Sequence, residues 1–290
     1  MARVTEVATG GVYALKRMHP ALVADSVARE RMLREAMLGM RGIDGVVRVI
    51  DVLDGDGTLS LLMQYVCGGS LARRLMGGAL PWRDATRMAV QVAHTLARLH
   101  ALKVIHRDVK PDNILLDPSG RPLVADLGIA HFKNAIRLTH GGGPATLEYC
   151  PPEQAAGRLH SFGPPTDIYA LAATLYDMVC GVPPFDTLPG PKRDTHECIQ
   201  AILTQDPTPP RRICRELPVA VEAVILKALS KDPGARHQTA KDFAADLQAA
   251  AGMRESLGSM VAVGVVASML AVALSVGAAA GLAQSAVTPA

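Results

Sequence analysis

The sequence predicts an α+β fold in which strands come first and helices follow. Within residues 1–66, apolar runs of strand length alternate with turns rich in Gly and Asp, around a single helical segment. Through residues 67–250, apolar residues recur at helical spacing. After residue 255 the chain carries no charged side chain. The 290 residues therefore have room for one domain and a short apolar appendage.

Composition excludes several classes of function. The net charge is +3, and Lys and Arg are scattered and not interleaved with the few aromatic residues, so we expect no nucleic-acid partner. The five cysteines are odd in number and never form a C-x-x-C pair. This pattern argues against a disulfide framework and against a zinc site, and it favours a reducing compartment.

Four strands are predicted in the first 66 residues. Residues 4–7 and 12–16 are two segments of strand length on either side of a Thr-Gly-Gly turn, which indicates a β-hairpin. Residues 46–52 and 59–66 are separated by the turn sequence Asp-Gly-Asp-Gly at 54–57. They are predicted as two antiparallel strands.

Residues 25–40 are rich in helix formers, and one carboxylate interrupts their apolar face. Glu35 shares this face with small and apolar residues only. A carboxylate that faces inward needs a cation, and Lys16, at the end of the second predicted strand, is the natural partner. The alternative is that Glu35 lies on a solvated face beside Arg31 or Arg34.

Residues 105–116, which we call the polar loop, hold the densest group of reactive side chains. Apolar residues at 104–105 and 114–116 flank its polar side chains and predict strand-like anchors that hold them still. Asp108 and Asn113 are five positions apart, which suits a carboxylate that receives a proton and an amide oxygen that faces a metal. The polar side chains of this loop are His106, Arg107, Asp108, Lys110, Asp112 and Asn113. A polar loop without chemistry is the alternative.

Helices are predicted on both sides of the polar loop. Residues 83–100 form an amphipathic pattern that ends at His100, which we expect to be structural. Residues 168–179 are apolar almost all round, as in a buried central helix. Asp167 opens this helix, and its simplest role is an N-cap.

The polar loop resembles the catalytic loop of protein kinases, whose signature is H-R-D-x-x-x-x-N. The order Asp-Val-Lys-Pro, which includes Lys110, is the form typical of serine/threonine kinases. Other segments match kinase landmarks in the same order along the chain. Residues 13–16, Tyr-Ala-Leu-Lys, resemble the V-A-I-K strand, residues 126–128, Asp-Leu-Gly, resemble D-F-G, and Pro152-Glu153 stands where kinases have A-P-E.

Over residues 4–250 the chain resembles bacterial membrane-anchored serine/threonine protein kinases. The resemblance implies a two-lobed protein-kinase-like fold, with a small β-rich lobe in residues 1–66 and a large helical lobe in residues 67–250. It implies transfer of the ATP γ-phosphoryl group to Ser or Thr hydroxyls of protein substrates, with Mg²⁺ as the metal. The family's glycine-rich loop is missing, since Gly10 and Gly11 lie too near the lysine strand. We therefore expect an N-terminally incomplete chain whose small lobe lacks its first strand.

The resemblance also implies roles for individual side chains. Asp108 would orient the substrate hydroxyl and accept its proton, and Lys110 would stabilise charge on the transferring phosphoryl group. Lys16, paired with Glu35, would hold the α- and β-phosphates. The Mg²⁺ ligands would be Asp126 and Asn113, whose hard oxygen atoms suit this metal.

Further residues are implied for the nucleotide and for the activation segment. Met63 would lie behind the purine as gatekeeper, and Gln64 and Val66 would offer hinge groups to the adenine. Thr139 is a hydroxyl that phosphorylation could modify. Thr146 resembles the Thr of a Gly-Thr-x-x-Tyr turn that bonds the catalytic Asp and Lys.

Five residues are implied as structural. Glu153 would be buried and would pair with Arg236, and Asp167 would anchor the backbone of the polar loop. Arg107 would pair with a phosphate on the activation segment. His106 completes the H-R-D signature.

The charge-free end of the chain is long enough to cross a membrane. Residues 259–283 are predicted as one transmembrane helix, since at ~1.5 Å per residue they span a hydrocarbon core of about 30 Å. Basic residues precede the span, which places the kinase-like part in the cytoplasm, below a linker at 251–258 and with an extracytoplasmic tail at 284–290. The spacing Gly277-x-x-x-Gly281 is compatible with a homodimer formed through this helix. The alternative is a buried soluble helix.

Two other functions remain open from the sequence. A pseudokinase that acts as a binding module at the membrane would explain the missing glycine-rich loop. A small-molecule phosphotransferase of the aminoglycoside-kinase kind shares an H-x-D-x-x-x-x-N loop. Pro152-Glu153, Asp167 and Arg236 favour a protein substrate.

Overall fold

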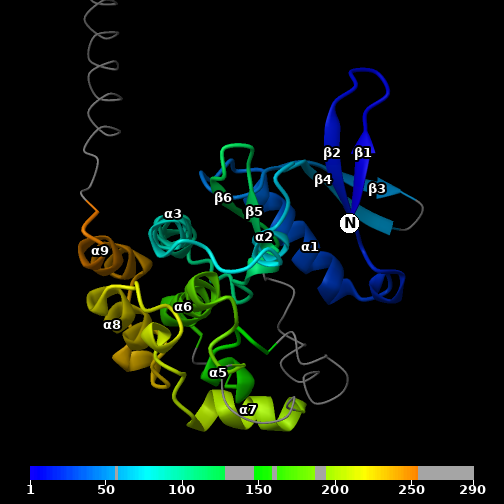
Figure 1. Ribbon diagram of the computed structural model, residues 1–290. Helices are drawn as coiled ribbons and strands as arrows, with labels where there is room; N and C mark the ends of the chain where they lie inside the picture. The colour runs from blue at the N-terminus through cyan, green and yellow to red at the C-terminus, as the bar shows by residue number, and fades with distance from the viewer. Residues whose placement is uncertain (56–57, 128–146, 159–161, 187–193, 254–290) are drawn as a thin grey trace, which may run out of the picture. The chain divides into compact units, whose positions relative to one another are not determined.

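Strands and helices separate along the chain as predicted, with the strands gathered at one end of residues 1–252 and most helices at the other (Figure 1). The computed structural model describes residues 1–55, 58–127, 147–158, 162–186 and 194–253. Residues 1–252 form one unit and 253–290 a second, and only the first is described below. The α+β prediction is confirmed for this unit.

The strands of this unit are β1 (Ala2–Thr5), β2 (Val12–Arg17), β3 (Val49–Gly55), β4 (Thr58–Gln64), β5 (Ile114–Leu116) and β6 (Pro122–Val124). Its α-helices are α1 (Ser26–Gly39), α2 (Leu71–Leu75), α3 (Trp82–Ala101), α5 (Pro152–Ala155), α6 (Pro164–Cys180), α7 (Thr195–Thr204), α8 (Val219–Ala228) and α9 (Ala240–Ala250). Short 3₁₀ turns are η1 (Pro20–Leu22), η2 (Pro111–Asn113), η6 (Pro210–Arg212) and η7 (Pro233–Ala235).

The first four strands form one antiparallel sheet in the order β1-β2-β4-β3. Alternate residues of β4, Leu59, Leu61 and Met63, are buried and form a core with α1. Gly39, near the end of α1, lets the helix approach β3, because a Cβ there would lie 2.3 Å from a methyl group of Val49. The sheet therefore fixes the face that α1 turns inward.

The predicted hairpin and first helix are confirmed. β1 and β2 pair as expected, and α1 begins after Asp25, whose carboxylate accepts hydrogen bonds from two backbone N–H groups of the first turn. The third strand begins at Val49 and not at residue 46 as predicted. Residues 45–47 instead bond to Val124 of β6, through backbone distances of 2.7 and 2.9 Å.

The helical part is built around α6, which is buried along nearly its whole length. Helix α3 packs against α6 and α9, and its buried residues follow the predicted apolar face. One local prediction, the strand at 104–105, and one alternative, the N-cap at Asp167, are wrong. Residues 104–105 form no strand, because the chain leaves α3 through a turn in which the N–H of Val104 donates to Leu99. Asp167 is not the N-cap, because α6 begins at Pro164.

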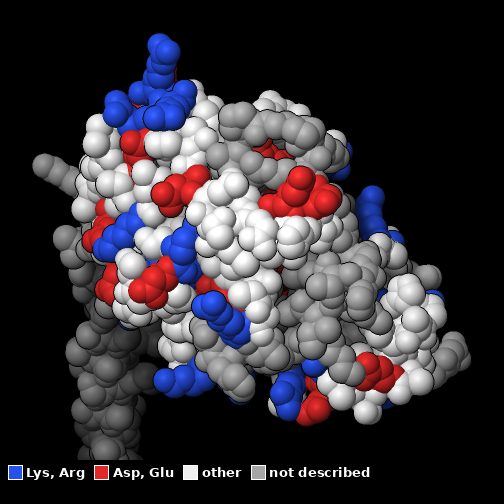
Figure 2. Space-filling model, turned by 90° about the horizontal axis from the view of Figure 1, so that it is seen from below, with Lys and Arg blue, Asp and Glu red and all other residues white. Residues whose placement is uncertain are grey.

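Within the described residues, no helix has the length and apolar character needed to span a bilayer. The predicted span at 259–283 and the tail at 284–290 lie outside the described residues, as do Thr139 and Thr146. All five cysteines fall in the described part of the chain and are free thiols. Acidic and basic side chains are both scattered over the face in Figure 2, as the mixed charge of the sequence leads one to expect.

Candidate active site

A buried carboxylate holds the backbone of the polar loop. Asp167, in the first turn of α6, accepts hydrogen bonds from the backbone N–H groups of His106 (2.8 Å) and Arg107 (2.7 Å). The Nε2 atom of His100, at the end of α3, lies 2.8 Å from the same carboxylate. These contacts offset the cost of burying the charge and fix the start of the loop against α6. The bond from His100 could not be read from the sequence, since its partner is 67 residues away.

The imidazole of His106 ties the polar loop to the strand that precedes Asp126. This ring is fully buried, and its Nδ1 accepts a hydrogen bond from the N–H of Asp108 at 3.2 Å. Because Nδ1 is an acceptor, Nε2 carries the proton and donates to the carbonyl of Ala125 at 3.0 Å. His106 thus sets the distance between the segments that carry Asp108 and Asp126.

The carboxylate of Asp108 lies among donors from its own loop. The Nδ2 atom of Asn113 donates to its Oδ2 (2.7 Å) and to its backbone carbonyl (2.8 Å). The Nζ atom of Lys110 lies 3.0 Å from the same Oδ2. Both side chains of this ion pair keep some exposure, 19% for Lys110 and 14% for Asp108. The carboxylate is therefore oriented and still reachable from solvent.

Asn113 and Asp126 offer oxygen ligands for a divalent cation. Strands β5 and β6 pair directly after Asn113, and the N–H of Ala125 donates to the Asn113 carbonyl at 2.8 Å, so the two residues are brought together. Since the amide nitrogen of Asn113 is engaged by Asp108, its amide oxygen is left for a metal. Two protein oxygens suit Mg²⁺, which keeps most of its waters. Among the described residues, no larger cluster of His, Cys, Asp or Glu is placed to hold a metal.

Lys16 lies between two carboxylates that come from different parts of the chain. Its Nζ is 2.7 Å from Glu35 on α1 and 2.6 Å from Asp126 beyond β6. Burial opposes the charge on Lys16, but the carboxylates of Glu35 and Asp126 outweigh it and raise the pKa of Lys16 above its ordinary value. Glu35 faces inward as predicted, with its side chain 7% exposed. The lysine is therefore charged and held where β2, α1 and β6 meet.

The residues expected to contact a nucleotide base lie at the end of β4. Met63 is buried and lies opposite Ala14 of β2 in the sheet. Gln64 is the last residue of β4, and its N–H donates to the carbonyl of Arg48 at 2.8 Å. Val66 follows and is almost fully buried. These positions border the same sheet as Lys16.

The pair between Glu153 and Arg236 forms as expected, and it lies deep in the helical part. Both oxygens of Glu153 accept from the guanidinium group at 2.9 Å. Arg236 also donates to the carbonyls of Ser230, Pro165 and Lys231. This full set of bonds is typical of a structural ion pair.

A contact between Tyr149 and α6 could not be predicted from the sequence. The hydroxyl of Tyr149 donates to Asp177 of α6 at 2.6 Å. Burial and the hydrogen bond to Asp177 raise the pKa of Tyr149 well above its ordinary value, so its proton is firmly held. Tyr149 stands in the Ala-Thr-Leu-Glu-Tyr segment, but nothing in the local sequence identifies Asp177 as its partner.

Comparisons with known proteins agree with the geometry. The family model described as "Protein kinase domain" matches residues 1–246. Serine/threonine-protein kinase PrkC of Bacillus subtilis is 34% identical over 207 residues, 71% of this chain and 31% of PrkC. Serine/threonine-protein kinase pkn3 of Myxococcus xanthus is 32% identical over 272 residues, 89% of this chain and 48% of pkn3. The chain thus spans less than half of the length of these curated relatives.

A solved structure extends the likeness to three dimensions. The crystal structure of the Mycobacterium tuberculosis PknI kinase domain, solved as a cysteine-to-alanine mutant, has a TM-score of 0.65 and 28% sequence identity to this chain. The match covers 86% of this chain and 89% of the PknI chain.

Proposed function

The chain belongs to the bacterial serine/threonine protein kinase domain family, and on that premise we propose that it transfers the γ-phosphoryl group of ATP to Ser and Thr hydroxyls of protein substrates. The observation that carries the proposal is the convergence of four residues. Asp108 is oriented by Asn113, Asn113 is bonded through its backbone to the residue before Asp126, and Asp126 meets Lys16.

Asp108 would act as the base in this reaction. Its carboxylate is fixed by two donors, and it keeps lone pairs that can accept the proton of a substrate hydroxyl. Lys110, 3.0 Å from Asp108, supplies a positive charge where negative charge develops on the transferring phosphoryl group. The Lys-containing form of the loop supports a serine/threonine substrate.

Lys16, Glu35 and Asp126 would hold the nucleotide end of the reaction. Lys16 binds phosphate oxygens, and Glu35 keeps it in place from the face of α1 opposite to solvent. Mg²⁺ held by Asp126 and Asn113 would supply neutralising charge to the phosphates. The hinge groups near Gln64 and Val66 would bind the adenine.

Replacement of Asp108 by Asn tests the catalytic part of the proposal. The full chain is incubated with labelled ATP, Mg²⁺ and a general protein substrate. We expect Asp108→Asn to lower phosphoryl transfer by ~10²–10⁴, the usual contribution of a general base. The matched control is Asp112→Asn, the same change at an exposed position of the same loop, which should keep most of the activity.

A measurement of nucleotide binding distinguishes a loss of catalysis from a loss of folding. Asp108→Asn should still bind ATP with Mg²⁺ and gain thermal stability from it, because Lys16 and Asp126 remain. Equal phosphate incorporation by the parent chain and Asp108→Asn would instead favour the binding-module alternative.

We also propose that residues 259–283 cross the cell membrane once and leave the kinase part in the cytoplasm. The support is compositional, since this segment has no charged residue and basic residues precede it. The Gly277–Gly281 spacing supports pairing of two such helices into a homodimer. Fractionation of cells that produce the full chain tests the span, and recovery in the soluble fraction would refute it. Cross-linking of the chain and of Gly281→Leu tests the pairing, which the leucine should weaken.

A further inference from the structure

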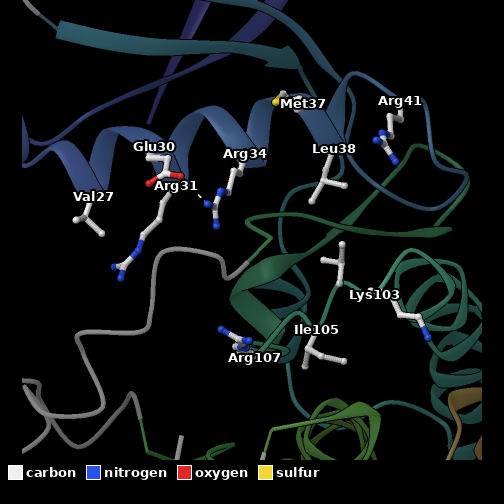
Figure 3. A pocket seen from close by; sticks show the side chains of 11 residues that line it. Val27, Glu30, Arg31, Arg34, Met37, Leu38, Arg41, Lys103, Ile105 and Arg107 are labelled. Carbon is white, nitrogen blue, oxygen red and sulfur yellow. Dashed lines mark hydrogen bonds and ion pairs between the residues drawn. The ribbon is translucent and has the colours of Figure 1, made fainter. Parts of the chain in front are cut away.

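A cavity of about 510 Å³ lies between α1 and the segment that leads from α3 into the polar loop. Figure 3 shows Arg31, Arg34 and Leu38 pointing from α1 toward the segment that carries Ile105 and Arg107. We call this cavity the α1 groove. It lies outside the contacts of Lys16, Asp108 and Asp126 described above.

Cations dominate the lining of the α1 groove. Five basic residues border it, namely Arg31, Arg34, Arg41, Lys103 and Arg107. Among the described residues that line it, Glu30 is the one acidic side chain, and it already pairs with Arg34 at 2.5 Å. Burial lowers the pKa of Arg107, and repulsion by Arg31 adds to this, against the attraction of Asp167. Such an excess of like charge in a concave surface favours an anionic ligand.

The α1 groove is also long and partly apolar. Its lining follows one face of α1 and the turn beyond it, from residue 27 to residue 41, which spans about 20 Å at the rise of a helix. Val27 and Met37, on this face, are 39% and 64% exposed. A compact metabolite would cover only part of this length, whereas about six residues of extended peptide would fill it. The shape therefore favours a peptide with both acidic and apolar side chains.

The chain itself contains few acidic residues outside the described ranges. Residues 128–146 include Lys133 and Arg137 and no Asp or Glu, and residues 187–193 include two basic residues and no acidic one. Residues 254–290 include a single acidic residue, Glu255. Charge complementarity therefore favours binding of a segment of another protein in the α1 groove over binding of an unmodified segment of this chain.

We propose that the α1 groove binds an acidic, partly apolar segment of a partner protein. The ligand would touch α1, the same helix whose Glu35 is buried beside Lys16. Because groove residues such as Arg31 and Leu38 are one turn from Glu35, an occupant of the groove biases the position of Glu35 and hence of Lys16. This regulatory consequence rests on the proposed kinase function, whereas binding itself does not.

The test uses the full chain and a labelled ten-residue peptide of alternating Glu and Leu pairs. Binding is followed by fluorescence anisotropy, with a control peptide in which every Glu is Gln. We expect the Glu peptide to bind and the Gln peptide to bind at least tenfold more weakly. The affinity for the Glu peptide should also fall as salt is raised, because the attraction is between charges that solvent ions screen.

The double variant Arg34→Gln, Arg41→Gln should bind the Glu peptide about tenfold more weakly, the effect of losing two partly exposed ion pairs. The control is Arg29→Gln, which removes one positive charge from α1 at a position outside the groove, where Arg29 pairs with Asp54. It should change binding less than about twofold. Lys103→Gln, just beyond the end of α3, provides a second groove variant should the double variant fold poorly.

Three results would overturn the proposal: equal binding of the Glu and Gln peptides, unchanged affinity in every folded groove variant, or binding only of a phosphorylated peptide that copies residues 133–146. The last result would assign the groove to the chain's own modified segment. If the chain binds the Glu peptide through Arg34 and Arg41 but transfers no phosphate, the proposed binding in the α1 groove is supported and the proposed function is refuted. In an active chain, Glu peptide at a concentration near the dissociation constant of the parent should change the rate of phosphoryl transfer more in the parent than in the groove variant.

Discussion

Two ion pairs in this molecule join distant parts of the chain, and they differ in how far their side chains are exposed to solvent. Arg236 and Glu153 are almost completely buried, with side chains 0% and 3% exposed, and the arginine also donates to three backbone carbonyls. Lys16 is 27% exposed, and its Nζ lies between Glu35 and Asp126. The first pair has no room for a ligand, whereas the second can exchange a carboxylate for a phosphate. The same interaction thus fixes the fold in one place and leaves a site adjustable in another.

Removal of the cation from the buried pair should have the largest effect on stability. Arg236→Met would leave the carboxylate of Glu153 buried without its bidentate partner. We expect the free energy of unfolding to fall by about 3–5 kcal/mol, as when one partner of a buried pair is lost. Chemical denaturation of the variant and the parent chain measures this difference.

The control for this experiment removes both charges. Glu153→Leu combined with Arg236→Met leaves no buried charge alone and should recover much of the lost stability. If the double variant is no more stable than Arg236→Met, the loss comes from packing or from the backbone carbonyls that Arg236 binds, and the comparison between the pairs would need a different basis.

Removal of the cation from the adjustable pair should affect activity more than stability. Lys16→Met should lower phosphoryl transfer by about 100-fold, because a positive charge aimed at the phosphates is lost. The free energy of unfolding should fall by less than in Arg236→Met, because solvent reaches Lys16 and Asp126, whose side chains are 27% and 33% exposed. Arg17→Met, the next residue on β2 and on its exposed face, is the matched control and should leave both quantities near their parent values. A stability loss as large as that of Arg236→Met would erase the distinction.

The partners of Lys16 could be predicted in part from the sequence. Glu35 lies 19 residues away, on a helix whose period alone indicates an inward carboxylate. The order of the kinase-like motifs was enough to predict an α+β chain with strands first, and the pair between Glu153 and Arg236. Charge and periodicity therefore indicated the pair of Lys16 and Glu35, whereas the pair of Glu153 and Arg236, 83 residues apart, was implied by the resemblance to protein kinases.

The contacts that the sequence did not reveal join segments with no pattern between them. His100 reaches Asp167 across 67 positions, and nothing in the end of α3 distinguishes this histidine from a helix cap. The strand predicted at 46–52 begins at Val49 in the structure, because residues 45–47 bond to β6 and not to the sheet. Asp167 was given an N-cap alternative, since the sequence does not show that α6 begins three residues earlier.

The smallest expected effect concerns the contact between Tyr149 and Asp177, which is intermediate between the two ion pairs in burial. Burial raises the pKa of Asp177 above its ordinary value, and the hydrogen bond from Tyr149 acts against this rise. Since the folded chain then holds this proton more tightly than the unfolded chain, stability from Asp177 is full at low pH and is lost as pH rises through its folded pKa. Tyr149→Phe removes the hydrogen-bond donor and raises the pKa of Asp177 further, so more stability is lost at neutral pH.

We expect Tyr149→Phe to lower the free energy of unfolding by about 1 kcal/mol at pH 7, the value of a typical hydrogen bond. The difference from the parent should shrink as pH falls below the folded pKa of Asp177, because a protonated carboxyl is a weaker acceptor than a carboxylate. Denaturation curves at a series of pH values measure it, with Tyr65→Phe, at an exposed tyrosine, as the matched control. A difference that stays constant with pH would show that the hydroxyl acts through packing and that the charge of Asp177 has no part in it.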